Sequence, residues 1–168
     1  MSSSRLKSLA LVLPLAFAPV ALAACSFQPV YSGRHAENPQ LELAYAEPDT
    51  RLQQIIYQDL AFRLGKSTSP TAPLVSVAVV AVDTEPYLSV TANPNKPREA
   101  TVTATLTITP RDGVDSTPIT ITRTARAQHT RAGQVLADEA AVIEAQERAA
   151  RAVAESLRLA VLAALGRE

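Results

Sequence analysis

The sequence has few of the residues from which catalytic and metal sites are usually built. Its 168 residues include one cysteine, no tryptophan and five glycines. The two histidines, His35 and His129, have no second histidine or cysteine at metal-ligand spacing. There is no G-x-S-x-G nucleophile motif and no phosphate-binding loop. The sequence therefore predicts neither an enzyme nor a protein that holds a metal ion or another cofactor.

The chain also lacks an excess of charge of either sign. Sixteen Lys and Arg residues balance sixteen Asp and Glu residues. Proteins that bind nucleic acid carry a clear basic excess, so nucleic acid is not an expected partner. Aromatic residues make up only 4% of the chain, and a single cysteine excludes an internal disulfide. Packing alone must therefore stabilise the folded domain.

One hydrophobic run is present, near the N-terminus, but it is too short to span a membrane. No charged residue occurs from Leu9 to Ala24, and Pro14 and Pro19 interrupt the run. A spanning helix needs roughly 20 apolar residues. The basic residues Arg5 and Lys7 precede the run, as in a secretory signal peptide. We therefore expect residues 1–24 to be removed.

The end of this signal matches the bacterial lipobox, Leu22-Ala23-Ala24-Cys25. In a lipobox the cysteine thiol receives a diacylglyceryl group, and cleavage frees an amine that takes a further acyl chain such as palmitate. Each buried methylene contributes about 0.8 kcal/mol, so two or three chains give a lasting anchor. An ordinary signal peptide with a nearby cysteine is the alternative. After cleavage, 14 basic residues face 16 acidic ones, a formal charge of −2.

The remaining sequence divides into a tether and one domain. Residues 25–40 contain Pro29, Gly33 and Asn38-Pro39 and sustain no periodicity, as expected of a lipidated tether. Residues 41–168 are predicted to form a single α+β domain. A short strand is expected at 41–46, and an amphipathic helix follows Pro48-Asp49-Thr50 and ends at Gly65.

The second half of the domain contains the clearest patterns. In residues 73–83, both the odd-numbered and the even-numbered positions, which point to opposite faces of a strand, are apolar. We call these two sets of positions the two parities of a strand. The pattern predicts a strand covered on both faces. Residues 99–110 and 119–128 alternate and flank Asp112-Gly113, which predicts an antiparallel hairpin. A long helix is expected from about Asp138 to Leu165. Its predicted apolar stripe comprises Ala140, Ile143, Ala150, Val153, Leu157, Val161 and Leu165.

The predicted order is β-α-β-β-β-α. A sheet must bury one face, and two amphipathic helices are available to cover it. We therefore expect a two-layer sandwich, in which two helices pack on a four-stranded, mostly antiparallel sheet.

Two surface patterns are candidates for function. Alternate positions of the hairpin carry threonine: Thr101, Thr103, Thr105, Thr107, Thr109, Thr120, Thr122 and Thr124. They form either a solvated sheet face, chosen for its β-propensity, or a surface for a polar partner such as the interior of a protein barrel. Basic residues also gather here: Lys96, Arg98, Arg111, Arg123, Arg126 and Arg131. This local excess is either ordinary surface or a contact for an anionic lipid.

The other polar residues of this region have simpler interpretations. His129 could serve as the base of a nucleophile, but a solvated histidine at a strand end is the simpler interpretation. Asp83 and Glu85, beside Pro86, are interpreted as the polar residues of a turn. Arg123 is unusual, because it shares its parity with Ile119 and Ile121.

The expected mature start, Cys25-Ser-Phe-Gln-Pro-Val-Tyr31, resembles the Cys-Gly-Phe-x-Pro-Leu-Tyr opening of the lipopolysaccharide (LPS) assembly lipoproteins, the LptE family, of the alphaproteobacterial type. Cys25, Phe27, Pro29 and Tyr31 match this motif, whereas Ser26 and Val30 differ from it. The C-terminal helix resembles that of the family in its acidic start and its many alanines.

This resemblance implies a four-stranded sheet backed by two helices. It also implies an outer-membrane lipoprotein that acts as plug and assembly partner of the LPS-inserting β-barrel LptD and faces the periplasm. Lys96, Arg98, Arg123, Arg126 and Arg131 are then candidate contacts for LPS phosphates. Ser26 is not the aspartate that retains lipoproteins in the inner membrane, which favours the outer one. The alternatives are an auxiliary periplasmic lipoprotein of an ABC-type lipid transporter and, less favoured, a hydrolase.

Overall fold

The computed structural model describes residues 41, 43–86, 95–111, 113 and 117–165. In chain order the elements are β1 (Ala44–Tyr45), α3 (Arg51–Leu64), β2 (Leu74–Thr84), β3 (Lys96–Thr109), β4 (Ile119–Arg131) and α4 (Val135–Leu165). The predicted order β-α-β-β-β-α is confirmed. The predicted signal peptide and tether, including Cys25, lie outside the described residues.

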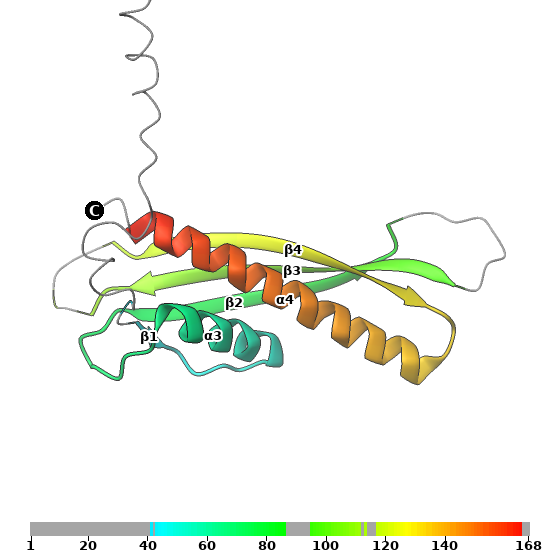
Figure 1. The fold of residues 1–168 in the computed structure, drawn as a ribbon, viewed down its shortest axis with the longest axis horizontal. Coiled ribbons are helices and arrows are strands. Elements are labelled where there is room, and N and C mark those ends of the chain that lie inside the picture. The colour runs from blue at the N-terminus through cyan, green and yellow to red at the C-terminus, as the bar shows by residue number, and fades with distance from the viewer. Residues whose placement is uncertain (1–40, 42, 87–94, 112, 114–116, 166–168) are drawn as a thin grey trace, which may run out of the picture.

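The four strands form one open sheet in the order β1-β2-β3-β4. β1 is parallel to β2, and the β2–β3 and β3–β4 pairs are antiparallel. α4 crosses the sheet diagonally, and α3 lies beside it (Figure 1). Both helices contribute to the same buried core, so the predicted two-layer α+β architecture is confirmed. β1 is shorter than the expected strand at 41–46.

Helix α3 begins with a capping box. Thr50 Oγ1 accepts the N–H of Gln53, and Gln53 Oε1 accepts the N–H of Thr50. These two bonds satisfy backbone groups that a helix start leaves open. Gly65 directly follows the last residue of the helix, has φ +87° and donates its N–H to the carbonyl of Ala61. The side chains of Ile56, Leu60 and Leu64 are fully buried against the core.

The hairpin has the predicted alternation. Five residues of β3 are buried on the helix side, namely Ala100, Val102, Ala104, Leu106 and Ile108. The intervening threonines occupy the opposite face, which no helix of the described residues covers. Thr103 and Thr105 form hydroxyl–hydroxyl hydrogen bonds with Thr124 and Thr122 of β4, at 2.9 and 3.0 Å.

Strand β2 is covered on one face only, so the prediction of cover on both faces was wrong. Val75 and Val77 are buried, whereas Val80 and Val82 on the other parity are 62% and 49% exposed. Both parities of the sequence are apolar, so alternation could not identify the open face. The position of the helices determines it.

Helix α4 is 31 residues long and begins three residues before the expected start. Its predicted stripe is correct from Ala150 onward but wrong in the first three turns, where Ala140 and Ile143 are exposed. There the line of residues that faces the sheet runs through Ala149, Ala145 and Val142 instead. The small alanines allow the helix to approach the sheet closely.

Candidate functional site

A hollow of about 380 Å³ lies where the C-terminal ends of β2 and β4 meet the start of α4. Its lining combines both signs of charge with two valines and comprises Asp83, Arg98, His129, Arg131, Gly133, Val135, Asp138, Glu139 and Val142. The strands carry these polar side chains on their helix-facing parity, beyond the end of the apolar core. We call this set the end cluster.

Asp83 is the centre of the end cluster. Its Oδ1 lies 2.8 Å from His129 Nε2, and its Oδ2 accepts a 2.7 Å hydrogen bond from Arg98 Nε. A second carboxylate, that of Glu85, lies 3.8 Å from Arg98 Nη1. The side chains of Asp83 and Arg98 are 21% and 18% exposed. The group is therefore a largely buried ion pair with a histidine attached.

The contact between Asp83 and His129 joins two strands that do not pair. β3 separates β2 from β4, and neighbouring strands lie about 4.8 Å apart. In the register, Ala100 of β3 lies between Asp83 and Ala127. The two alanines leave room on the sheet, so the longer side chains reach one another above them. The small residues thus permit the polar contact.

His129 was predicted to be solvated, and that interpretation was wrong: its side chain is only 3% exposed. An ionised Asp83 can only accept hydrogen bonds, so His129 Nε2 carries the proton that it donates. His129 Nδ1 is buried and has no partner among the described residues. The turn interpretation of Asp83 was also wrong, because the residue belongs to β2.

The environment of Asp83 affects its titration in two directions. Burial alone raises the pKa of its carboxyl group. Hydrogen bonds from His129 and Arg98, with the positive charge of Arg98, lower it by more, so the pKa lies below its ordinary value. Asp83 therefore remains ionised at neutral pH.

The carboxylate of Asp138 fixes the start of α4 at this cluster. Asp138 accepts hydrogen bonds from the backbone N–H groups of Ala132 and Gly133, at 2.8 and 3.0 Å. Gly133 has φ +79°, a conformation that glycine adopts without strain. Arg131 Nε lies 3.8 Å from Asp138 Oδ2. The turn between β4 and α4 is thus tied to the helix that follows it.

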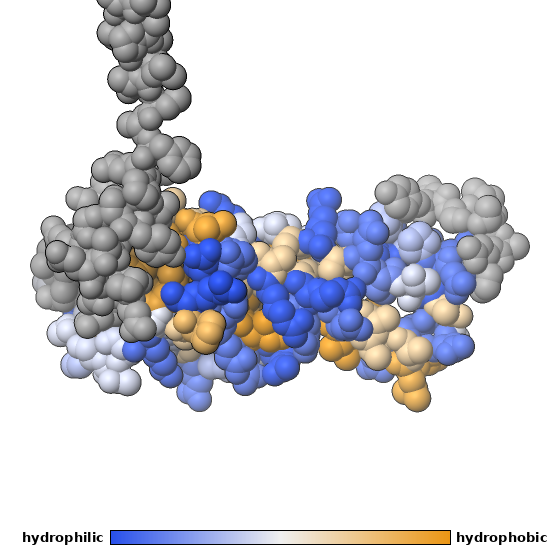
Figure 2. All heavy atoms as spheres, in the orientation of Figure 1, coloured by the Kyte–Doolittle hydropathy of each residue, from blue (hydrophilic) through white to orange (hydrophobic). Residues whose placement is uncertain are grey.

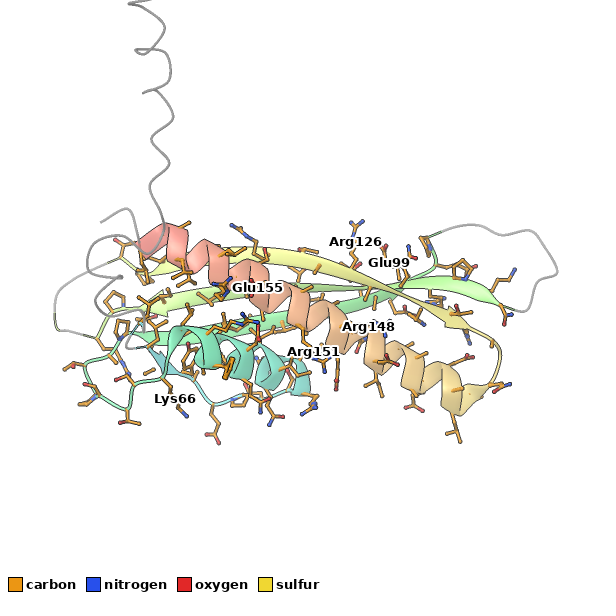
Figure 3. The ribbon with its side chains drawn as sticks, in the orientation of Figure 1. Lys66, Glu99, Arg126, Arg148, Arg151 and Glu155 are labelled. Carbon is orange, nitrogen blue, oxygen red and sulfur yellow. The ribbon has the colours of Figure 1, made fainter. Side chains whose placement is uncertain are left out.

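The predicted basic contacts do not form one patch. Lys96, Arg98 and Arg131 lie together at this end of the sheet, where Lys96 pairs in register with Arg131 and Arg98 with His129. Arg126 belongs to the threonine-bearing face and lies 3.6 Å from Glu99, beside it in Figure 3. Arg123 is exposed on the helix-facing parity and donates to the carbonyl of Thr122. A role in LPS binding stays a prediction for all five.

The alternation of the strands could have revealed the end cluster. Asp83 shares its parity with Val75 and Val77, and His129 shares its parity with Ile119 and Ile121. The sequence interpretation noted this conflict only for Arg123. Charged residues on the core parity of two strands are the signal that it missed.

Apolar side chains are exposed within and beside the end cluster. Val135 and Leu136, in the first turn of α4, are 78% and 82% exposed. Figure 2 shows apolar atoms at this end of the molecule, next to charged ones. Within the described ranges, no group of three His, Cys, Asp or Glu residues could hold a metal ion, and neither helix is long and apolar enough to cross a membrane.

One solved structure supports this fold. A crystal structure of a protein described as a lipoprotein, from Caulobacter crescentus CB15, matches with a TM-score of 0.55 and 20% identity; the match covers 81% of this chain and 100% of that one. A minor lipoprotein of Acinetobacter baumannii matches with a TM-score of 0.49 and 16% identity, over 74% of this chain and 90% of that one. A search of curated proteins gives no match.

The family comparison covers most of the domain. The model of the LptE family, described as lipopolysaccharide-assembly, matches residues 39–159. This range contains every strand and most of α4. The chain therefore belongs to the LptE family of lipopolysaccharide-assembly proteins.

Proposed function

We propose that this chain is a lipoprotein of the outer membrane, anchored through acyl chains on Cys25, that acts as plug and assembly partner of the LPS-inserting barrel LptD. Its role is to bind and support the barrel, without catalysis, while LPS passes to the outer leaflet. One observation carries this proposal. In this member of the LptE family, the second face of the sheet is lined with threonine, and no helix of the described residues covers it.

The open face has the chemistry that a wet barrel lumen requires. In each Thr–Thr pair, one hydroxyl donates its proton to the other. The second hydroxyl proton and several lone pairs of each pair can therefore form hydrogen bonds with a partner. The interior of a barrel is polar, and such groups can bond to it directly or through water. Val80 and Val82 add apolar contact at one side of this face.

The end cluster is the proposed contact for LPS phosphates. Arg131 is 63% exposed at the hollow, and its Nε lies 3.8 Å from the carboxylate of Asp138, so its guanidinium has donors available. Lys96 pairs with it in register. The exposed Val135 and Leu136 lie next to these cations and suit the acyl chains of a lipid.

Co-purification tests the partner. A tagged full-length chain is extracted in mild detergent from its own cells, and the bound proteins are identified by mass spectrometry. We expect LptD to be recovered in stoichiometric amount. Recovery of an ABC-type lipid transporter instead would favour the auxiliary role, and recovery of no membrane protein would contradict both. Depletion separates the two roles as well, since loss of the plug should abolish surface LPS, whereas loss of an auxiliary should alter phospholipid asymmetry.

The anchor is tested separately with Cys25→Ala. We expect the wild-type protein to show the mass of a triacylated cysteine and to fractionate with the outer membrane. The variant should lose both properties. A wild-type protein with a free thiol would exclude the proposed anchoring.

A further inference from the structure

The two edges of the sheet differ in how they are protected. At the β4 edge, two guanidinium groups bind backbone carbonyls: Arg123 Nη1 donates to Thr122 at 2.8 Å, and Arg148 Nη2 donates to Gln128 at 2.9 Å. Arg148, which is labelled in Figure 3, belongs to α4. Charged side chains at an edge discourage pairing with another chain. The β4 edge is therefore protected at these two positions.

At the β2 edge, protection stops at Val77. β1 accompanies β2 only at Leu74 and Val75. At the next edge-facing residue, the N–H of Val77 donates to Tyr57 Oη, and its carbonyl accepts from Gln53 Nε2, both at 2.9 Å. Two side chains of α3 thus take the place of a neighbouring strand.

Beyond Val77 the same edge is open. Backbone groups alternate in direction along a strand, so those of Val79, Ala81 and Asp83 face outward as those of Val77 do. Within the described part of the chain, nothing bonds to the outward groups of Val79 or Ala81, and only Arg98 Nη2 approaches the carbonyl of Asp83, at 3.4 Å. Residues 78–82 carry no charge. Such an edge is a template for another strand.

The geometry of this stretch fits a second copy of itself. The open part runs from Ala78, after the capped Val77, to Thr84, where β2 ends. The midpoint of this stretch is Ala81. If a twofold axis passes there, Ala81 lies opposite Ala81 of the second copy in an antiparallel pair. The backbone groups of Ala81 face outward, so the two residues can form a hydrogen-bonded pair. That axis places Val79 opposite Asp83, and Val80 opposite Val82. Cross-strand pairs of β-branched residues stabilise a sheet, and here they cover the exposed valines.

We propose that the open β2 edge docks onto the β2 edge of a second copy of this chain, so that two four-stranded sheets join into one of eight strands. The twofold axis is perpendicular to the sheet, so the helices of both copies lie on the same face. Each α3 caps its own strand at Val77, and the two caps lie at opposite ends of the shared ladder. The joined sheet is twice as wide as that of a single copy. We therefore assign the dimer to the chain when it is not inside the proposed barrel.

Cysteine cross-linking tests the register. At a non-hydrogen-bonded pair the Cα atoms lie about 4.5 Å apart, within the range of a disulfide. We expect full-length Val80→Cys mixed with full-length Val82→Cys to form a disulfide-linked dimer under mild oxidation. Either variant alone should give at least fivefold less cross-linked dimer, because residue 80 of one copy faces residue 82, and not residue 80, of the other copy. Both variants retain Cys25, so each variant by itself shows how much cross-linking through Cys25 occurs. Equal cross-linking in all samples, or in none, would overturn the proposed register.

Proline substitution tests the edge itself. Ala81→Pro removes an outward N–H that the chain's own sheet does not use, and proline is tolerated at such edge positions. We expect it to raise the dissociation constant of the dimer at least tenfold in sedimentation experiments. Thr120→Pro, on the outward parity of β4, is the matched control and should leave the dimer unchanged.

Three outcomes of the sedimentation experiments would overturn the proposal. These are a wild-type chain that stays monomeric at all concentrations, a dimer that survives Ala81→Pro, and a dimer that Thr120→Pro weakens equally. Circular dichroism of each variant identifies a loss of fold. If Val80→Cys cross-links to another protein instead, the edge belongs to a partner strand and not to a second copy.

Discussion

His129 of β4 lies 2.8 Å from Asp83 of β2 although the two strands are not neighbours in the sheet. The contact passes above Ala100 of β3 and brings together the ends of three strands. Arg98, from the intervening strand, completes it. The end of the sheet that carries the proposed LPS contacts is thus held by a buried polar network and not by apolar packing.

Asp83→Asn should destabilise the fold. The amide preserves the shape but removes the charge that holds Arg98 and His129, and loss of a charge-assisted, partly buried hydrogen bond costs about 1–3 kcal/mol. Urea unfolding measures the change in the free energy of unfolding. Asp59→Asn is the control, because its contact with Arg63 is 3.9 Å long and more exposed, and it should cost less than about 0.5 kcal/mol. Equal costs would contradict a special role for the end cluster.

The stabilisation from Asp83 should depend on pH in one direction. Its pKa is lowered in the folded state from the ordinary value of 3.8. The group therefore contributes its full stabilisation above the unfolded pKa, and this stabilisation disappears as the pH falls through the folded pKa. We expect the difference in unfolding free energy between wild type and Asp83→Asn to be constant above about pH 5 and to shrink below about pH 4. A difference that grows on acidification would contradict the assignment.

Tyr45 of β1 and Tyr57 of α3 are in contact and should respond differently to loss of the hydroxyl group. Their rings form an edge-to-face contact, with centroids 5.9 Å apart. Tyr57→Phe leaves the N–H of Val77 without its acceptor and should cost about 1–2 kcal/mol. The Tyr45 hydroxyl is buried without a partner in the described structure, so Tyr45→Phe should be neutral or stabilising. Thermal and urea unfolding of both variants provide the comparison.

The threonine-bearing face should matter for the partner more than for the fold. Thr105→Val with Thr122→Val replaces a hydroxyl pair by a pair of β-branched side chains, which suits a strand equally well. We expect a free energy of unfolding within about 0.5 kcal/mol of wild type. Recovery of LptD with the tagged variant should fall several-fold. Unchanged recovery would indicate that another surface contacts the barrel.

The basic residues should separate by position in an LPS-binding assay. Lys96→Gln with Arg131→Gln changes one cation of the end cluster, Arg131, and the lysine opposite it in the register, and we expect it to weaken binding at least fivefold. Arg123→Gln with Arg126→Gln removes the same charge elsewhere on β4 and should have less than a twofold effect. Arg98 is unsuitable for this test, because it also binds Asp83. Equal effects of the two double variants would indicate a response to net charge alone.

Several features could be predicted from local patterns because their physical causes are local. The capping box at Thr50 and the glycine at Gly65 mark both ends of α3. Alternation in β3 identified its buried face, because only one parity there is apolar. The length of α4 follows from an uninterrupted run of good helix formers. None of these inferences required knowledge of which elements are neighbours.

Other features could not be predicted, since they depend on where distant elements meet. The exposure of Ile143 depends on the diagonal path of α4, and that of Val80 on the absence of a third layer in the described fold. The side chain of His129 is buried beside a carboxylate that lies 46 residues earlier in the chain.

By itself, the sequence determined the order of the elements, the two-layer architecture and the resemblance to the LptE family, because periodicity, capping and a short motif are properties of contiguous residues. The tertiary structure alone decided which apolar residues stay exposed, which charges are paired and which sheet edge is open. These depend on the packing of segments far apart in the chain, and a list of residues in order does not contain those distances.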